Sequence, residues 1–196
     1  MPNDFTPTFF NELDDTPAHA WALLARGVAD RRSAFHTPTL ITQTISGAPA
    51  ARTVVLRACD VPARTLRFHT DERSAKVAEI ERMPRVIVHG YDFKSKAQLR
   101  LEGHARVMEA SSDAARAAWL GSQESSRMIY AQTHAPGAPI NAPAQGDGRD
   151  GAAEENFSII MVVIDAFEWL YLHHAGHRRA RFAWQPEGWR GQWLAP

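Results

Sequence analysis

The stretch "TLITQTISGAPAARTVVLRACDVPARTLRFHT", residues 39–70, decides the fold of this chain. It holds three runs rich in β-branched and apolar residues: 39–45, 52–57 and 65–70. The short segments between them, "SGAP" (46–49) and "DVPA" (60–63), contain the Gly, Pro and Asp that are typical of hairpin turns. The pattern therefore predicts three consecutive antiparallel strands.

The remainder of the chain continues in the same way. In "AQLRLEGHARV" (97–107), Leu99, Leu101 and Val107 alternate with polar residues, which predicts a strand with one buried face. Further strands are expected at 85–91, 157–172, 177–185 and 189–194, with a hairpin at "HAG" (174–176). Because most connections have hairpin length, the predicted fold is an antiparallel barrel or sandwich with peripheral helices, and not a doubly wound parallel sheet.

Helices are expected at the edges of this sheet. The pair Thr16-Pro17 reads as an N-cap and first helical position, and Met83-Pro84 ends a second helix. The four predicted helices cover about 17–30, 73–82, 112–121 and 123–132. The Ala-, Gly- and Pro-rich segment 134–155 is expected to be a long mobile loop.

Composition limits the classes of function. The 196 residues include 22 basic and 22 acidic side chains, so the chain gives no reason to expect nucleic acid or an anionic membrane as a partner. We expect one domain, 1–196, because the length suits a single core. No signal peptide is visible, the longest apolar run (159–164) is too short to span a membrane, and the lone Cys59 fits a reducing cytoplasm.

The turn "RFHTDERSAK" (67–76) combines Thr70, Ser74 and Lys76 at the start of a helix. Hydroxyls, an ammonium and the free N–H groups of a helix N-terminus suit a phosphate monoester. Arg52 would join them if the runs 52–57 and 65–70 pair. The alternative is that the hydroxyls only cap the helix and that the lysine is solvated.

Four linked motifs carry a resemblance to a known family. They are R-x-V-x-L-[KR] from Arg52, F-x-T-x-x-x-S-x-K from Phe68, Q-x-R-x-x-G from Gln98, and R-F at Arg181 before a Trp-bearing last strand. Together they resemble the pyridoxamine 5'-phosphate oxidase family of FMN-binding split β-barrels, over most of residues 35–196. The resemblance implies an antiparallel split barrel, FMN as cofactor, and a homodimer with flavin at the subunit interface.

The resemblance also implies roles for individual residues. Arg52, Ser74 and Lys76 match phosphate contacts, Arg57 lies near the ring and the substrate, and Arg181 lies near the pyrimidine end of the ring. The full set of implied cofactor contacts is Arg52, Thr53, Val54, Val55, Leu56, Arg57, His69, Thr70, Ser74, Lys76, Gln98 and Arg181. A regular strand would place Arg52 and Arg57 on opposite faces, so a bulge or twist is expected between them.

The substrate side departs from the family pattern. Ala75 replaces a frequent basic residue, and Tyr171 stands where many members have Trp. The family's Tyr, Arg and Ser that hold the substrate phosphate correspond here to Trp119, Gln123 and about Arg127. The residues implied for substrate are Arg57, Trp119, Gln123, Arg127, His177 and Arg179. No catalytic residue is assigned.

Two other patterns have ordinary explanations. His173, His174 and His177 form H-H-x-x-H without a fourth ligand, so they are interpreted as solvated turn residues and no metal site is predicted. Cys59 has no matched base and is interpreted as a buried structural residue.

Three functions remain open from the sequence. The first is an FMN-dependent oxidoreductase of the pyridoxamine 5'-phosphate oxidase-like group, with an unassigned substrate. The second is a flavin-binding protein without pyridoxamine phosphate oxidase activity. The third is a binder of another planar cofactor, such as haem or deazaflavin; the set of Arg52, Ser74 and Lys76 favours FMN over haem.

Overall fold

The computed structural model describes residues 8–143, 153–174 and 176–196. Within these ranges the chain forms one nine-stranded sheet in which every neighbouring pair is antiparallel. The strands are β1 (Thr39–Gln43), β2 (Pro49–Thr53), β3 (Leu56–Asp60), β4 (Thr65–Asp71), β5 (Arg85–Asp92), β6 (Ala97–Met108), β7 (Phe157–Tyr171), β8 (Arg178–Gln185) and β9 (Gly188–Leu194). The predicted antiparallel sheet is confirmed.

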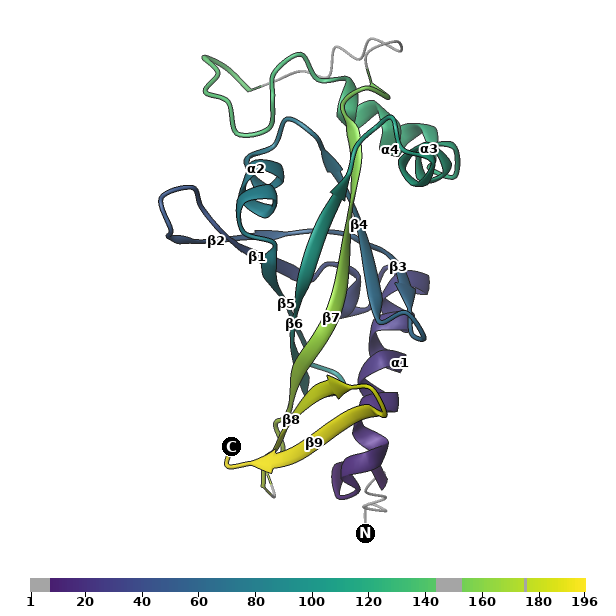
Figure 1. Ribbon diagram of the computed structural model, residues 1–196, viewed down its shortest axis with the longest axis vertical. Coiled ribbons are helices and arrows are strands. Elements are labelled where there is room, and N and C mark those ends of the chain that lie inside the picture. Colours follow the sequence, from purple (N-terminus) through teal and green to yellow (C-terminus); the bar gives the residue numbers. More distant parts are fainter. Residues whose placement is uncertain (1–7, 144–152, 175) are drawn as a thin grey trace.

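Strand β7 is the axis of the sheet. Its 15 residues pair with β4 near one end, with β6 along nearly the whole length, and with β8 near the other end. The sheet order is β2-β1-β5-β6-β7-β4-β3, and β8 and β9 continue from β7. Figure 1 shows β7 running almost the full height of the molecule, with β8 and β9 at its lower end.

The predicted single strand 52–57 is wrong. The chain leaves the sheet at Val54 and Val55, so Arg52 lies on β2 and pairs with Leu40 of β1. Arg57 lies on β3, which pairs with β4 and has an irregular register at Arg57 itself. The expected bulge therefore exists, but a change of strand also separates the two arginines.

The helices lie outside the sheet, as expected. They are α1 (Thr16–Ala29), α2 (Ala75–Arg82), α3 (Asp113–Leu120) and α4 (Glu124–Arg127), with the 3-10 turns η1 (Thr8–Phe10), η2 (Leu13–Asp15), η3 (Ala34–His36) and η4 (Met128–Ala131). In Figure 1, α1 runs beside the lower sheet, α2 lies near β1, and α3 and α4 lie at the upper end.

Two helix predictions need correction. Thr16 is the first residue of α1 and not its N-cap, because its hydroxyl donates to the carbonyl of Phe9 at 3.1 Å. The helix predicted for 123–132 is one α-helical turn followed by η4. Ser112 does cap α3, since its Oγ accepts from the Ala115 N–H at 3.2 Å.

The main core lies between the sheet and α1. Phe68, Leu99, Phe167 and Trp169 are almost fully buried in it. A smaller cluster, which includes Trp119 and residues at the start of β7, packs under α3. These two clusters hold the upper and lower parts of β7 rigidly, and so fix the side chains that project from its neighbours.

Gly103, the last residue of the Q-x-R-x-x-G motif, has a packing reason. The register between β6 and β7 shifts beside it, and a Cβ at this position would lie 2.3 Å from the carbonyl oxygen of Val163. Only glycine permits this close approach of two strands.

Of the predicted loop 134–155, residues 144–152 lie outside the described ranges. Residues 134–143 form turns and bends without a helix or strand.

Among the helices that the structure describes, none combines the length and apolar character needed to cross a bilayer.

Candidate functional site

Thr70, Ser74 and Lys76 meet where β4 gives way to α2. The Lys76 Nζ donates to the hydroxyl oxygens of Ser74 at 2.8 Å and Thr70 at 3.0 Å, and these hydroxyls lie 3.1 Å apart. Thr70 and Ser74 are buried, and Lys76 is half-buried. We call these three residues the hydroxyl–lysine cluster. Their convergence at a helix N-terminus is what the sequence predicted.

Ser74 does not act as a helix cap. It occupies the N-cap position of α2, but its side chain accepts no capping hydrogen bond. Its hydroxyl instead donates to the Asp71 carbonyl at 2.7 Å and accepts from Lys76. The capping explanation therefore does not account for this hydroxyl, whose oxygen is directed towards the ammonium.

Lys76 is an incompletely neutralised cation. Within the described residues no carboxylate lies within ion-pair distance of its ammonium, and its contacts are the two hydroxyls. Burial lowers the pKa of Lys76, and the nearby charge of Arg52 lowers it further, while Asp71 and Glu79 act in the opposite direction. An anion bound here would restore the environment that an ammonium prefers.

Arg52 reaches this region by a different route from the one predicted. Its Nη2 donates to Glu79 Oε2 at 2.8 Å, and its Nη1 donates to the hydroxyl of Thr42. Glu79 lies on α2, is buried, and also accepts from Thr42 at 2.5 Å. Arg52 is therefore held beside Lys76 by a buried carboxylate, and not by pairing of its strand with β4.

The four residues between Arg52 and Arg57 differ in their exposure to solvent. Val54 and Leu56 are buried in the core, Val55 is half-buried, and Thr53 is exposed. Side-chain contact of Val54 or Leu56 with a planar ring would therefore require the core to open. The backbone of this link and Val55 are the parts available to a ligand.

Arg57 and His69 line a cavity of about 340 Å³ on the other side of β4. Arg31 and Arg67 also line it, and Gln123 does so from the start of α4. We call it the arginine cavity. His69 and Thr70 are consecutive in β4, so their side chains point to opposite faces of the strand. The arginine cavity and the hydroxyl–lysine cluster are therefore separated by β4.

His69 is expected to remain neutral at physiological pH. Burial, and then the charges of Arg57 and Arg67, lower the pKa of His69 to about 4. In a pH titration followed by NMR, the His69 Cε1 proton should not shift between pH 7.5 and 5.5. A His69 midpoint near 6.5 would show that the imidazole is neither buried nor faced by these two guanidinium groups.

Trp119 and Arg127, two of the residues implied for the substrate, lie outside the arginine cavity. Trp119 is buried against Phe157 and Tyr130 in the smaller core cluster. Arg127 donates twice to the Ser122 carbonyl, and its guanidinium lies 5.4 Å from the Trp119 ring centroid. Neither side chain lines the arginine cavity. Both residues line a different cavity, of about 360 Å³, together with Glu124 and Glu154.

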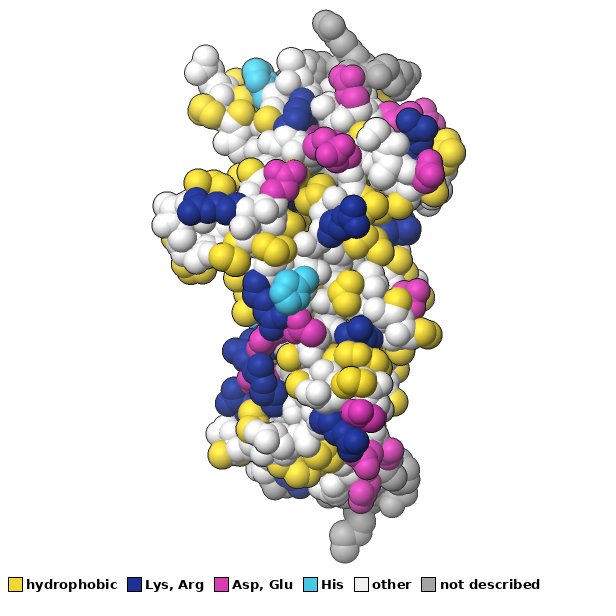
Figure 2. All heavy atoms as spheres, in the orientation of Figure 1, with side chains coloured by type: hydrophobic (Ala, Val, Ile, Leu, Met, Phe, Trp, Pro, Cys, Tyr) yellow, Lys and Arg dark blue, Asp and Glu magenta, His cyan; other side chains and the backbone are white. Residues whose placement is uncertain are grey.

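The C-terminal residues of the predicted site lie at the far end of β7. Arg181 donates to Glu102 at 3.0 Å and to Glu168 at 3.3 Å, and Arg179 donates to Glu168 at 2.7 Å. Gln98 and exposed His177 lie near this end too. Figure 2 shows basic and acidic side chains intermixed along the left flank of the molecule.

The strand register gives the distance between the hydroxyl–lysine cluster and Arg181. Thr70 pairs with Ser158 of β7, and Arg181 pairs with Glu168, ten residues further along the same strand. At about 3.3 Å per residue this is roughly 30 Å. One chain therefore does not bring Gln98 and Arg181 to the hydroxyl–lysine cluster.

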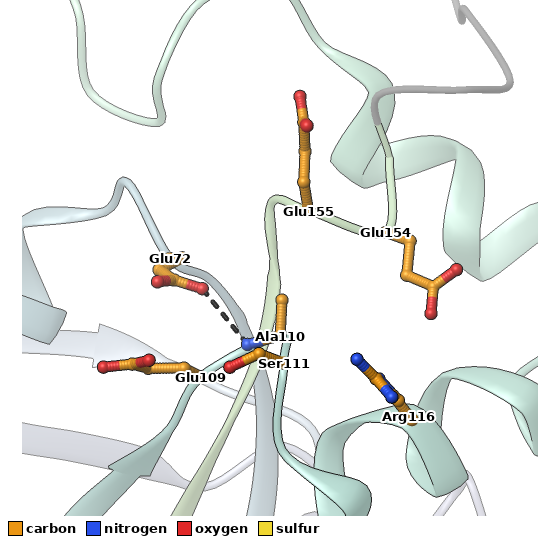
Figure 3. A pocket seen from close by; sticks show the side chains of 7 residues that line it. All are labelled: Glu72, Glu109, Ala110, Ser111, Arg116, Glu154 and Glu155. Atoms are coloured by element: carbon orange, nitrogen blue, oxygen red, sulfur yellow. Dashed lines mark hydrogen bonds between the residues drawn. The ribbon is translucent and has the colours of Figure 1, made fainter.

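A second cavity, of about 470 Å³, has the opposite charge. Glu72, Glu109, Glu154 and Glu155 line it, with Arg116 as the one basic residue of its lining. Figure 3 shows the Glu72 carboxylate bonded to the Ala110 N–H and Arg116 projecting from α3. Such a lining repels phosphate, so this cavity is not the counterpart of the predicted site.

Sequence reasoning missed Arg31, Arg67 and Glu79. Arg67 had a usable signal, because it alternates with His69 on β4 and so shares its face. Glu79 lies three residues after Lys76 and therefore near it on α2. Arg31 lies in the connection that follows α1, and no periodicity places such a residue.

Comparisons with known proteins agree with this geometry. Residues 18–109 match the family model "Pyridoxamine 5'-phosphate oxidase, FMN-binding domain". A pyridoxine/pyridoxamine 5'-phosphate oxidase 2 of Arabidopsis thaliana is 30% identical over 109 residues, which are 53% of this chain and 54% of that protein. An oxidase of the same description from Rubrobacter xylanophilus is 42% identical over 76 residues, 38% of this chain and 34% of that protein.

The similarity covers about half or less of the length of these curated relatives. It therefore does not show that this chain has their activity. Among solved structures, a pyridoxamine 5'-phosphate oxidase-related, FMN-binding protein from Nostoc punctiforme has a TM-score of 0.77 at 23% identity, covering 91% of this chain and 96% of that one. PhzG from Burkholderia lata has a TM-score of 0.69 at 18% identity, covering 98% of each chain. The predicted split-barrel fold is confirmed.

The motifs from Arg52 to Gln98 lie inside the matched segment. The family model, the two curated relatives and the shared fold agree with one another. Residues 18–109 are therefore similar to the FMN-binding domain of the pyridoxamine 5'-phosphate oxidase family, and the chain as a whole has the split-barrel fold.

Proposed function

We propose that the protein binds FMN and acts as an FMN-dependent oxidoreductase. The observation that carries the proposal is the hydroxyl–lysine cluster at the N-terminus of α2. A phosphate there would accept from Lys76, from one or both hydroxyls and from the first N–H groups of the helix. The lowered pKa of Lys76 and the absence of a capping hydrogen bond to Ser74 both favour the binding of an anion here.

The protein's part in the chemistry is binding and electrostatics. Bound FMN supplies hydride acceptance, which no side chain of this chain provides. Lys76 and Arg52 hold the phosphate end, and Arg52 is kept in place by Glu79. The connection between β2 and β3, at Val54 and Val55, offers backbone groups to the flavin ring. Arg181 favours the negative charge that a reduced ring carries at its pyrimidine end.

A homodimer completes this site. The hydroxyl–lysine cluster and Arg181 are about ten residues apart along β7, so they reach one flavin only if a second copy supplies the second group. Exposed apolar side chains such as Phe93, Leu120 and Trp193 offer surface for association. The proposal thus places each flavin between the turn of one subunit and Arg181 of the other.

A flavin-binding protein without pyridoxamine phosphate oxidase activity is the second candidate. It is supported by Trp119 and Arg127, which pack against each other at positions where the resemblance implies the family's substrate-phosphate residues. Both candidate functions include a cytoplasmic location. The free Cys59 fits a reducing compartment. Its thiol is half-buried, and burial raises the pKa of this thiol to about 11.

The direct test is the absorbance spectrum of the purified protein with mass spectrometry of the cofactor released by heat. FMN is expected, and not FAD, because the hydroxyl–lysine cluster suits a single terminal phosphate. The G-x-G-x-x-G match at 146–151 lies in the Ala-, Gly- and Pro-rich segment and does not join a predicted strand directly to a predicted helix, as a pyrophosphate-binding loop would. Release of FAD or haem, or no flavin uptake from excess FMN, would contradict the proposal. Turnover of pyridoxamine phosphate then separates the two candidates.

A further inference from the structure

Glu79 places a carboxylate beside the cations of the candidate site. It lies on α2, three residues after Lys76, and its side chain is only 7% exposed. Its Oε2 accepts from Arg52 Nη2 at 2.8 Å and from the Thr42 hydroxyl at 2.5 Å. A negative charge is therefore fixed next to the place where a phosphate would bind.

The β1–β2 hairpin holds the partners of this carboxylate in place. Arg52 of β2 pairs with Leu40 of β1, and Thr42 lies two residues further along β1. Arg52 and Thr42 are therefore diagonal neighbours on one face of the hairpin. The guanidinium donates through Nη1 to Thr42 and through Nη2 to Glu79. Both terminal nitrogens of Arg52 are thus engaged within the chain.

The two cations of the candidate site are not equivalent. Lys76 has no carboxylate within ion-pair distance among the described residues, whereas Arg52 has one at 2.8 Å. A phosphate monoester carries about 1.5 to 2 negative charges at pH 7. With Glu79 opposing one of the two cations, this group of side chains carries less positive charge than the phosphate carries negative charge.

The charge of Glu79 also extends to the ammonium of Lys76. Burial, and then the charge of Arg52, lower the pKa of Lys76, while Asp71 and Glu79 raise it. Because the ammonium would donate directly to the phosphate, a charge that acts on the ammonium also acts on the anion bound to it. The two effects have opposite signs: the carboxylate favours a charged lysine and repels a phosphate.

We infer that Glu79 is a specificity-determining residue of this site, which engages Arg52, repels the phosphate and so lowers the preference for a phosphorylated over an unphosphorylated flavin. The inference rests on the proposed function for the flavin, but its effect on a phosphate group does not depend on what carries that group. Glutamine at this position would still orient Arg52, because an amide oxygen accepts from both the guanidinium and the Thr42 hydroxyl. Glu79→Gln therefore separates charge from position.

The first measurement compares FMN with riboflavin by fluorescence-quench titration of the flavin-free protein. Glu79→Gln should tighten FMN binding about tenfold and leave riboflavin binding unchanged, because only FMN carries the charge that the carboxylate repels. Glu81→Gln, which removes an exposed carboxylate from the same helix, is the matched control and should bind both flavins as the wild type does. Unchanged or weaker FMN binding in Glu79→Gln, or an equal change for both flavins, would overturn the inference.

Inorganic phosphate tests the same effect without flavin. A ligand of the folded state raises the unfolding temperature, so phosphate should stabilise the flavin-free protein at constant ionic strength. Glu79→Gln should reach a given rise at about tenfold lower phosphate concentration than the wild type. Equal concentrations for the two proteins would contradict the inference. If this result holds but FMN does not bind, the proposed function fails and the role of Glu79 stands.

Lys76→Ala shows where the phosphate binds in this experiment. It should remove most of the stabilisation by phosphate from the wild-type protein, because it removes the cation of the hydroxyl–lysine cluster that has no carboxylate partner. If the stabilisation persists in Lys76→Ala, the phosphate binds elsewhere and the inference is wrong.

A double variant decides the matter if Glu79→Gln does not fold. Arg52→Gln combined with Glu79→Gln removes both members of the ion pair, so no charge stays buried without its partner. Because Glu79 offsets much of the charge of Arg52, this variant should weaken FMN binding less than Lys76→Ala does. A loss equal to that of Lys76→Ala, or larger, would mean that the phosphate uses the full charge of Arg52, against the inference.

Discussion

Lys76→Ala is expected to weaken FMN binding roughly tenfold to a hundredfold and to leave riboflavin binding unchanged. A charge-assisted hydrogen bond to phosphate contributes about 1.5–3 kcal/mol, and Lys76 has no carboxylate partner that would take its place. Ser74→Ala should have a smaller effect, because a neutral hydroxyl contributes about 0.5–1.5 kcal/mol. Fluorescence-quench titration of both flavins against both variants measures the difference.

The control for charge alone is Lys94→Ala, at the exposed turn between β5 and β6. It removes the same group from the surface and should not change the affinity for either flavin. If Lys76→Ala weakens riboflavin as much as FMN, then the loss comes from damage to the fold around α2, and the phosphate assignment fails.

Mixing two defective variants is expected to restore flavin sites. In the proposed dimer, each flavin site combines the turn of one subunit with Arg181 of the other. Lys76→Ala damages the turn, and Arg181→Ala removes the guanidinium that the second subunit would supply. A mixed dimer then has one doubly damaged site and one intact site. After equal amounts of the two variants are unfolded and refolded together, about a quarter of all sites should bind FMN with wild-type affinity, because half of the dimers are mixed.

Each variant refolded alone is the control, and neither should yield sites of wild-type affinity. The outcome that opposes the composite site is equally clear. If the mixture binds FMN as the average of its two components, then each flavin is held by one chain, and the roughly 30 Å between Thr70 and Arg181 excludes Arg181 from the site.

The sequence predicted the fold well where alternation and turns are local. The strand at 97–107 and the helix between Ser112 and Gly121 agree with β6 and α3 within a few residues, because side-chain period and caps act over short distances. The division of 52–57 into β2 and β3 was not predictable in the same way. It depends on which distant strands each half pairs with, which propensity does not encode.

In the candidate site, too, the local contacts were predictable from the sequence and the long-range contacts were not. Thr70, Ser74 and Lys76 lie within seven residues, so the turn alone brings them together. The partner of Arg52 came from α2, 27 residues away, and Arg31 meets Arg67 only through the tertiary fold. The resemblance implied a role for Arg181 near the flavin ring, but it did not show that one chain holds this residue so far from the turn.

The length of β7 has a consequence for how two flavins would behave in a dimer. In a two-fold arrangement, the two ends of one β7 would contribute to different flavin sites, which this strand would hold roughly 30 Å apart. Two sites at this spacing would not touch each other. Each would take up ligand and be reduced on its own, so flavin titrations should follow a simple hyperbola without cooperativity.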